Sequence, residues 1–354
     1  MKNGAIVGFG RLASGAGRNQ EVFPKIWQPH SIMGGINSLP NATLRAVCDP
    51  NLELMNQLDE GISKYADHKD LLEREDLDFL AIATRAPMRL KIATDAINAG
   101  CKKLHLEKPL CTNLAELENF SSLIYANSVV FTYGAIRRYL EPYKIAKQLV
   151  HSNYYGPLRE LRVNYGLAPL FWTHSHFIDL MLYFIESEPV NVKVDANHLR
   201  TSISGKSLIV ENDPIIQEMT IEFKNGKIGK INSKSDMSLE LIFQDGVLII
   251  DKNGERMSFK SNHDTLLTLD KIWDQTSLTN PQGYSLVIGE LLDFQESAIL
   301  GKQDIYRSMS DALSGQRILF MIVDTLLAQQ GLRSDQIESR SKIFLGLGPT
   351  NLPA

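Results

Sequence analysis

The chain has 354 residues, of which 44% are hydrophobic and 22% charged, and its formal net charge is -4. This length is too great for most single hydrophobic cores and predicts two domains. Lys and Arg are scattered rather than clustered, which argues against a nucleic-acid-binding protein, and no apolar run is long enough to span a membrane.

The first part of the chain alternates short apolar runs with helical patterns. Strands are predicted over 5–9, 43–48, 79–83, 103–106 and 129–133, and helices over 52–65, 90–99 and 114–126. Because strands and helices alternate, we expect a parallel sheet with right-handed crossovers, which is the doubly wound Rossmann arrangement. Residues 1–135 form this dinucleotide-binding domain in our interpretation.

After about residue 155 strands dominate, and most follow one another without an intervening helix. They are predicted over 158–165, 190–195, 216–223, 227–233, 239–243 and 247–251, with helices over 175–186, 284–300 and 308–329. Turn sequences such as Asp245-Gly246 are typical of hairpins. We therefore interpret residues 136–354 as an α+β substrate-binding domain with an open, mostly antiparallel, helix-backed sheet, and with a C-terminal helix able to pack back on the first domain.

The three cysteines, Cys48, Cys101 and Cys111, are odd in number and lack metal-ligand spacing. We interpret them as small buried residues of a chain in a reducing cytoplasm. The first apolar run, over residues 5–7, already belongs to a core strand. We therefore expect no cleaved signal peptide and a cytoplasmic protein.

A glycine motif follows the first predicted strand directly. Gly8 and Gly10 begin the pattern G-x-G-x-x-A, in which the first glycine allows a tight turn and the second lets the backbone approach a pyrophosphate. Because the motif follows the first strand of an alternating α/β pattern, we expect a dinucleotide site formed by Gly8, Gly10, Arg11 and Leu12. The alternative is a glycine turn with a structural role only.

Asp49 ends the second predicted strand, where an acidic side chain accepts hydrogen bonds from an adenosine ribose and repels a 2′-phosphate. This favours NAD over NADP, and it is compatible with the alternative that Asp49 caps the following turn. Asp49 lies 39 residues after Gly10, whereas about 20 is usual. We attribute the surplus to an insertion over residues 14–29, which would start the first helix near His30 and could cover the cofactor or the substrate.

A more specific signal is the sequence Leu106-Glu107-Lys108-Pro109-Leu110, at the end of a strand and at the edge where doubly wound sheets bind ligands. With the glycine motif it resembles the Gfo/Idh/MocA family of oxidoreductases (glucose–fructose oxidoreductase, inositol dehydrogenase and rhizopine catabolism). The resemblance implies that Lys108 lies beside the nicotinamide and the reacting hydroxyl, and that Glu107 makes a cofactor-ribose or sheet-end contact. The alternative for Lys108 is a solvated lysine at a strand end.

The second constellation is the run WTHSHFID, from Trp172 to Asp179. Family members often carry D-x-G-x-H-x-x-D here, so the resemblance implies that His176 is an acid/base group, which suits an imidazole with a pKa near neutrality. Asp179 would orient His176 from one helical turn away, and both are expected at the substrate together with Trp172. The sequence departs from the family where Trp172 replaces an aspartate and His174 a glycine.

Two alternatives apply to these histidines. His176 could be a capping or core histidine. His174 and His176 together could suggest a metal site, but no further ligand cluster accompanies them, so we expect no metal.

Two smaller matches concern the cofactor and the cleft. Thr84 is expected to contact the dinucleotide, although Arg85 and Arg89 stand where many relatives carry proline and histidine. Arg138 matches the family's arginine at the substrate cleft, and with Arg137 it could grip an anionic substrate. A pair of surface arginines is the alternative.

These features predict an oxidoreductase that uses NAD, with NADP less expected, and transfers a hydride to or from a carbinol or keto carbon of a sugar, nucleotide sugar or cyclitol, with Lys108 and His176 as acid/base groups. The main alternative is a non-catalytic dinucleotide-binding regulator of the same fold, which the loss of the aspartate at Trp172 favours; a metal-dependent hydrolase is a third hypothesis. The resemblance also implies a homodimer or homotetramer formed through the second domain's sheet. We expect a small sugar-like substrate and no nucleic-acid or membrane partner.

Overall fold

A computed structural model of the chain describes residues 1–17, 24–204, 207–262, 269–274, 276, 278, 280, 282–294, 299–332 and 343–345. The described residues divide into two units. Unit 1 is drawn from Met1–Ile136 and Pro281–Leu313, and unit 2 from Arg137–Asn280 and Ser314–Gly346. Helix α9, Ile299–Gln329, contributes its first half to unit 1 and its second half to unit 2.

Unit 1 is built on a parallel sheet whose described strands have the order β3-β2-β1-β4-β5-β6. Their bounds are β1 Lys2–Val7, β2 Ala42–Cys48, β3 Ser63–Tyr65, β4 Phe79–Ile82, β5 Lys103–Leu106 and β6 Val130–Tyr133. Strands β4 and β6 are buried along their whole length, as parallel strands are when helices cover both faces. The strand order reverses between β1 and β4, so the carboxyl ends of these two strands frame the crevice where such sheets bind ligands.

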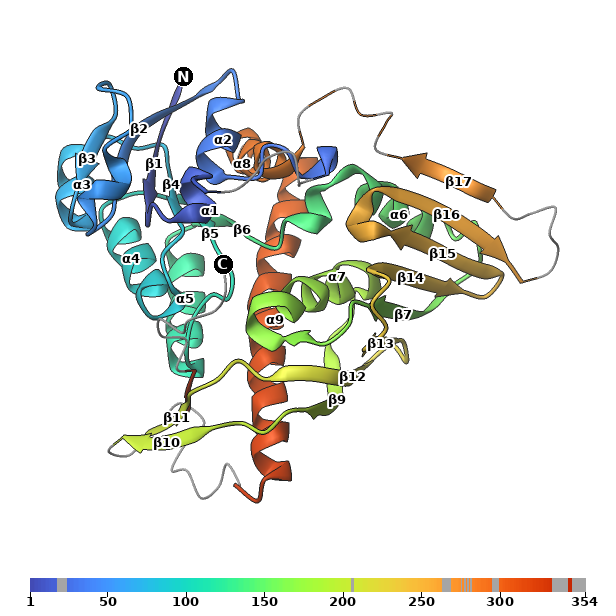
Figure 1. Cartoon of the computed structure of the whole chain (residues 1–354). Helices are drawn as coiled ribbons and strands as arrows, with labels where there is room; N and C mark the ends of the chain where they lie inside the picture. Colours follow the sequence, from blue (N-terminus) through green and yellow to red (C-terminus); the bar gives the residue numbers. More distant parts are fainter. Residues whose placement is uncertain are drawn as a thin grey trace. The chain divides into compact units, whose positions relative to one another are not determined.

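Helices cover both faces of this sheet in two groups (Figure 1). One group consists of α3 His68–Arg74, α4 Ala86–Asn98 and α5 Leu114–Ala126. The other consists of α1 Arg11–Ser14, α2 Ile32–Asn37 and α8 Gly283–Asp293. Helix α8 contacts β5 and β6 although the sequence places it far beyond them.

Unit 2 contains a larger sheet, in which the described strands have the order β17-β16-β15-β14-β7-β13-β12-β8, with β9 also paired to β12. The strands are β7 Leu158–Asn164, β8 Ala168–Pro169, β9 Pro189–Ala196, β12 Ile215–Phe223, β13 Ile228–Asn232, β14 Ser238–Phe243, β15 Gly246–Asp251, β16 Arg256–Ser261 and β17 Leu269–Asp274. Strands β7 and β13 pair in parallel, while the other pairs of this sheet are antiparallel.

Two helices of unit 2, α6 Glu141–Ser152 and α7 Ser175–Ile185, pack on this sheet. The second half of α9 packs against α7, where Leu182 lies 3.6 Å from the Cβ position of Gly315. A small sheet joins β10 Thr201–Ser204, β11 Ser207–Val210 and β18 Ile343–Leu345. The predicted fold class, a Rossmann domain followed by a helix-backed and mostly antiparallel sheet, is confirmed.

Three sequence-based expectations about elements are wrong. Residues 52–65 form a 3₁₀ turn at Leu52–Met55 and then strand β3. Apolar residues recur there at helical spacing, but Met55 is the one buried residue of the segment, so tertiary packing does not stabilise a helix. The helix expected over 284–300 ends at Asp293, and residues 295–298 lie outside the described residues. Most of the final stretch from residue 337 also lies outside them.

The third correction concerns the first helix. Helix α1 begins at Arg11, immediately after Gly10, rather than near His30. It lasts one turn because Gly15, at φ 79°, ends it in the left-handed conformation. Helix α2 then begins at Ile32, where the side chain of Ser31 accepts the Gly34 N–H at 3.1 Å.

Cys48, Cys101 and Cys111 are buried free thiols, as predicted. Burial raises the pKa of Cys48 to about 12 and that of Cys101 to about 11, so neither is a nucleophile at neutral pH. Within the described part of the chain, no helix combines the length and hydropathy that crossing a membrane requires.

Candidate functional site

Strand β1 delivers the glycine motif to the carboxyl edge of the parallel sheet. Gly8 has φ +88°, and a Cβ at this position would lie 2.7 Å from the backbone nitrogen of Thr84, so the turn requires glycine. Gly10 differs, because no atom lies within 4 Å of its Cβ position. The Gly10 backbone therefore borders open space into which another group can come close.

Thr84 follows β4 directly beside this turn. Its hydroxyl oxygen is buried and has no hydrogen-bond partner among the described residues. Buried hydroxyls normally have a partner, and an exception at a candidate site suggests one that is supplied from outside the chain. The unsatisfied hydroxyl and the open space at Gly10 both fit a dinucleotide bound along this edge. Helix α1 is only one turn long, so the backbone of Gly8 to Leu12, rather than a helix dipole, would hold the pyrophosphate.

Asp49 stabilises the same loop from the end of β2. Its Oδ2 accepts the Phe9 N–H at 2.8 Å and its Oδ1 accepts the Asn51 N–H at 2.9 Å. The capping alternative is thus what the structure shows. The carboxylate is half-buried, and each oxygen keeps a lone pair that can accept from a ribose hydroxyl, so the ribose contact stays a prediction.

Glu107 carries a buried carboxylate, 3% exposed, at the end of β5. Its Oε1 accepts the Tyr284 hydroxyl at 2.5 Å and lies 3.5 Å from His105 Nε2, while its Oε2 accepts the Lys108 N–H at 3.3 Å. Burial alone would raise the pKa of Glu107, but His105, Tyr284 and Lys108 outweigh it and hold the pKa below its usual range. Of the two contacts expected for Glu107, the described one is at the sheet end.

Arg89 holds the other side of the Glu-Lys-Pro segment. Its guanidinium donates to the backbone carbonyls of Thr84 and Pro109 and is 3% exposed. Burial lowers the pKa of Arg89 to about 10, so it remains charged at neutral pH. Lys108 is half-buried. It lies in the chain between Glu107, whose carboxylate is held by hydrogen bonds, and Pro109, whose carbonyl is held by Arg89. This role of Arg89 was not predicted from the sequence, where Arg89 is only a departure from the family pattern.

In unit 2, a π-helical turn, Leu170–His174, leads into α7. The Asp213 carboxylate accepts the Phe171 N–H at 2.8 Å and the Trp172 N–H at 3.0 Å. Trp172 is 61% exposed, and His176 is half-buried in the first turn of α7. The carboxylate of Asp213 thus caps the turn at which family members carry an aspartate, although no sequence signal indicated it.

Arg138 and Asp179 form a buried ion pair in unit 2. Arg138 Nε donates to Asp179 Oδ2 at 2.9 Å and Nη2 to the Asp179 carbonyl at 3.2 Å, and both side chains are almost fully buried. Arg137 is also buried, with Nε 2.8 Å from Asn253 Oδ1 and its guanidinium 4.7 Å from the Phe177 ring centre. The alternative of two surface arginines is therefore wrong.

His174 is a core histidine with 0% exposure. Burial lowers the pKa of His174 to about 4, against an opposing contact with the Ala168 backbone, so the ring is neutral at pH 7. Among the residues that the structure describes, no group of three or more His, Cys, Asp or Glu side chains gathers into a metal site. The site residues divide by unit: Lys108 and the cofactor candidates belong to unit 1, and Arg138, Trp172, His176 and Asp179 to unit 2.

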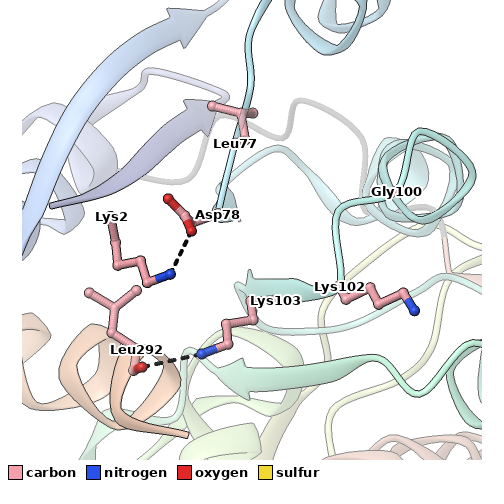
Figure 2. Close-up of a pocket in the computed structure, with 7 residues that line it drawn as sticks. All are labelled: Lys2, Leu77, Asp78, Gly100, Lys102, Lys103 and Leu292. Atoms are coloured by element: carbon pink, nitrogen blue, oxygen red, sulfur yellow. Dashed lines mark hydrogen bonds and ion pairs between the residues drawn. The ribbon is translucent and has the colours of Figure 1, made fainter. Parts of the chain in front are cut away.

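A small pocket of unit 1 lies at the opposite edge of the parallel sheet, where β1 and β5 begin (Figure 2). Lys2 Nζ is 2.8 Å from Asp78 Oδ1, and Lys103 Nζ donates to the Leu292 and Phe294 carbonyls at the end of α8. Lys103 thus provides a hydrogen-bond donor for the last carbonyls of α8, and Lys2 provides a counter-charge for the Asp78 carboxylate. Because the strands are parallel, this pocket is remote from the edge that carries Gly10 and Lys108.

Comparisons with known proteins agree with the Rossmann fold of unit 1. Residues 2–135 match the oxidoreductase family with an NAD-binding Rossmann fold named GFO_IDH_MocA. The chain is 23% identical over 258 residues to myo-inositol 2-dehydrogenase of Thermotoga maritima, an alignment that covers 63% of this chain and 75% of that protein.

Solved structures share the fold over nearly the whole chain. A dehydrogenase from Chromobacterium violaceum is 16% identical with a TM-score of 0.71, over 95% of this chain and 98% of that one. The WlbA dehydrogenase from Bordetella pertussis, in complex with NADH and UDP-GlcNAcA, is 15% identical with a TM-score of 0.62, over 95% and 97%. Residues 2–135 thus carry the NAD-binding Rossmann domain of the Gfo/Idh/MocA family of oxidoreductases.

Proposed function

We propose that this protein is an NAD-dependent dehydrogenase or reductase that acts on a carbinol or keto carbon of a sugar, nucleotide sugar or cyclitol. The observation that carries the proposal is the position of Lys108, between the buried Glu107 carboxylate and the Arg89 clamp, at the sheet edge where Gly10 borders open space. The named relatives support the substrate class, since one is an inositol dehydrogenase and another was solved with NADH and a nucleotide sugar.

The division of labour follows from the side chains. A bound nicotinamide would supply the hydride acceptor or donor. The Lys108 amine would hold the reacting oxygen by a hydrogen bond, and His176 would take or return the hydroxyl proton. Backbone groups of Gly8 to Leu12 with the Thr84 hydroxyl would hold the dinucleotide, and Asp49 would accept from the adenosine ribose, which favours NAD over NADP. Trp172 would stack on the sugar ring, because an exposed indole offers an apolar face to C–H groups.

The charge on Arg138 is matched by Asp179 in the structure. An anionic substrate group at Arg138 would therefore compete with that carboxylate. We accordingly expect Arg138 and Asp179 to orient groups around a neutral part of the substrate.

The proposal also includes a homo-oligomer formed through the open face of unit 2's sheet and a cytoplasmic location. Side chains such as Arg162, Glu160 and Glu240 form ion pairs on that face and are only partly exposed. The buried free thiols fit a reducing compartment.

The first experiment identifies any dinucleotide released from the denatured protein, then titrates the emptied protein with NADH and NADPH by fluorescence. We expect tighter binding of NADH. A panel of cyclitols, free sugars and UDP-sugars is then screened for NAD reduction. If NADH binds but no compound in the panel turns over, the non-catalytic regulator that the indole at Trp172 favours becomes the better assignment; no binding of either cofactor would overturn the proposal.

The catalytic roles are tested by Lys108→Met and His176→Gln, with Lys102→Met as the matched control. Lys102 is an exposed lysine of the same unit at the opposite sheet edge. We expect Lys108→Met to lower kcat by about 10² to 10⁴ while the Kd for NADH changes little, and Lys102→Met to change neither. Undiminished turnover of Lys108→Met would remove Lys108 from the chemistry.

A further inference from the structure

The buried carboxylate of Glu107 is held by a residue that the sequence places very far away. Tyr284 lies 177 positions from Glu107, yet its hydroxyl donates to Glu107 Oε1 at 2.5 Å. The Tyr284 ring meets the His105 ring edge-on, with centres 5.7 Å apart and planes at 89°. His105 Nδ1 lies 3.1 Å from Thr132 Oγ1 on β6. Four residues with exposures of 4% or less thus form one continuous buried chain.

The backbone on both sides fixes Tyr284 in this place. The Tyr284 N–H donates to the Pro29 carbonyl at 3.0 Å, and the Gln282 N–H to the Gln28 carbonyl at 2.9 Å. A Cβ at Gly35 on α2 would lie 2.7 Å from the Tyr284 Cβ. The last residues of the 14–29 insertion therefore anchor the start of α8, which is a structural role for that end of the insertion.

Glu107 is equally confined. A Cβ at Gly134, just beyond β6, would lie 2.4 Å from Glu107 Oε2. The same oxygen accepts the Lys108 N–H at 3.3 Å. Displacement of the Glu107 carboxylate would therefore disturb the backbone of Lys108. Arg89 restrains the same segment from its other end, because it binds the carbonyl of Pro109.

We propose that Tyr284 is a positioning residue for Lys108: it holds the Glu107 carboxylate, which in turn fixes the backbone from which the Lys108 amine extends. This inference rests on the proposed role of Lys108 at the reacting oxygen. Misplacement of a reacting group by about 1 Å lowers a rate by as much as about 10². The buried hydroxyl of Tyr284 on helix α8 thereby helps to fix the position of the Lys108 amine, although Tyr284 lies outside the loops that would bind the nucleotide.

The test compares Tyr284→Phe with Tyr125→Phe, whose ring is 60% exposed on α5. With the sugar substrate found in the screen, we expect Tyr284→Phe to lower kcat by about tenfold, with the Kd for NADH within about twofold and the KM little changed. Tyr125→Phe should leave all three constants unchanged. A purely structural hydroxyl would lower the melting temperature without this selective loss of kcat.

A second measurement needs no substrate. Competitive acetylation of the protein with acetic anhydride across pH, read by peptide mass spectrometry, reports the reactivity of each lysine, and Lys102 serves as internal reference. We expect Tyr284→Phe to change the Lys108 profile and to leave the Lys102 profile as in the wild type. Changed Lys108 labelling in a protein that turns over no sugar would uphold the positioning and refute the proposed chemistry.

A double-mutant cycle measures the coupling between Tyr284 and Glu107. Glu107→Gln keeps an acceptor for Tyr284 but removes the charge, and we expect its effect on Lys108 labelling to be non-additive with that of Tyr284→Phe. Additive effects, or a Tyr284→Phe protein with wild-type kcat and wild-type Lys108 labelling, would overturn the inference.

Discussion

The two units bury charge in different ways. In unit 1 the Glu107 carboxylate is held by a tyrosine hydroxyl, a histidine ring and a backbone N–H. In unit 2 the Asp179 carboxylate is held by the guanidinium of Arg138. The charge of Glu107 interacts with the nearby charges of Arg89 and Lys108, whereas the charge of Asp179 is paired directly with one guanidinium.

The difference bears on function. The Glu107 carboxylate interacts electrostatically with Lys108, whose amine we place at the reacting oxygen, and the partners of Glu107 can tune that effect. The ion pair joins the segment before α6 to helix α7 and mainly holds the unit together. We therefore expect changes in the first cluster to alter catalysis more than stability, and changes in the second to do the reverse.

The largest effect on stability should come from breaking the buried pair. Arg138→Met leaves Asp179 charged and buried, and we expect the free energy of unfolding to fall by about 3–5 kcal/mol. Urea denaturation followed by circular dichroism measures it. The double variant Arg138→Met with Asp179→Leu should recover most of the loss, because two apolar groups need no counter-charge; a single variant as stable as the wild type would show that the pair is dispensable.

The next effect depends on pH and concerns His174. Its pKa is about 4 in the folded chain and about 6.5 when unfolded. Between pH 6.5 and 4 the unfolded chain therefore takes up a proton that the folded chain does not, so stability falls as pH falls, by roughly 3 kcal/mol in all. His174→Leu should flatten this part of the profile, and an unchanged difference between pH 7 and pH 4.5 would contradict the burial of a neutral ring.

Much of this architecture could be predicted from the sequence because local patterns determine it. The strands of unit 1 are apolar runs that end in turn residues, and Glu107-Lys108-Pro109 lies at a strand end in both the sequence and the structure. The helix predicted over 52–65 does not form although apolar residues recur there at helical spacing, because Met55 alone is buried and tertiary packing does not support the helix.

The missed site residues depend on contacts that no local pattern encodes. Tyr284 meets Glu107 only after α8 returns to the sheet, and Asp213 meets the turn at Trp172 from 41 positions away. The burial of Arg89 could not be predicted from its residue type, because a charged residue on a helix is normally exposed to solvent. Its burial follows from two backbone carbonyls that only the folded sheet edge brings together.

A smaller effect would test the confinement of Glu107 directly. A methyl group at Gly134 would have to displace the carboxylate, so Gly134→Ala should lower the free energy of unfolding by about 1–3 kcal/mol and lower kcat together with it. Gly61→Ala is the matched control, because no atom lies within 4 Å of its Cβ position, and it should change stability by less than about 0.5 kcal/mol. Equal behaviour of the two variants would mean that the carboxylate has room to move.

The smallest effect is expected on the open face of unit 2's sheet, where charges pair in partial contact with solvent. Arg162 lies 2.7 Å from Glu160 and 3.2 Å from Glu240, with 34% of its side chain exposed. Arg162→Ala should therefore lower the free energy of unfolding by only about 0.5–1 kcal/mol, and high salt should erase much of the difference. Measurement over a range of protein concentrations separates two cases. A small loss, independent of concentration, is what a solvated face gives. A several-fold greater loss that shrinks on dilution would mean that a second copy of the chain covers this face, because association stabilises the folded state only at concentrations where the partner binds.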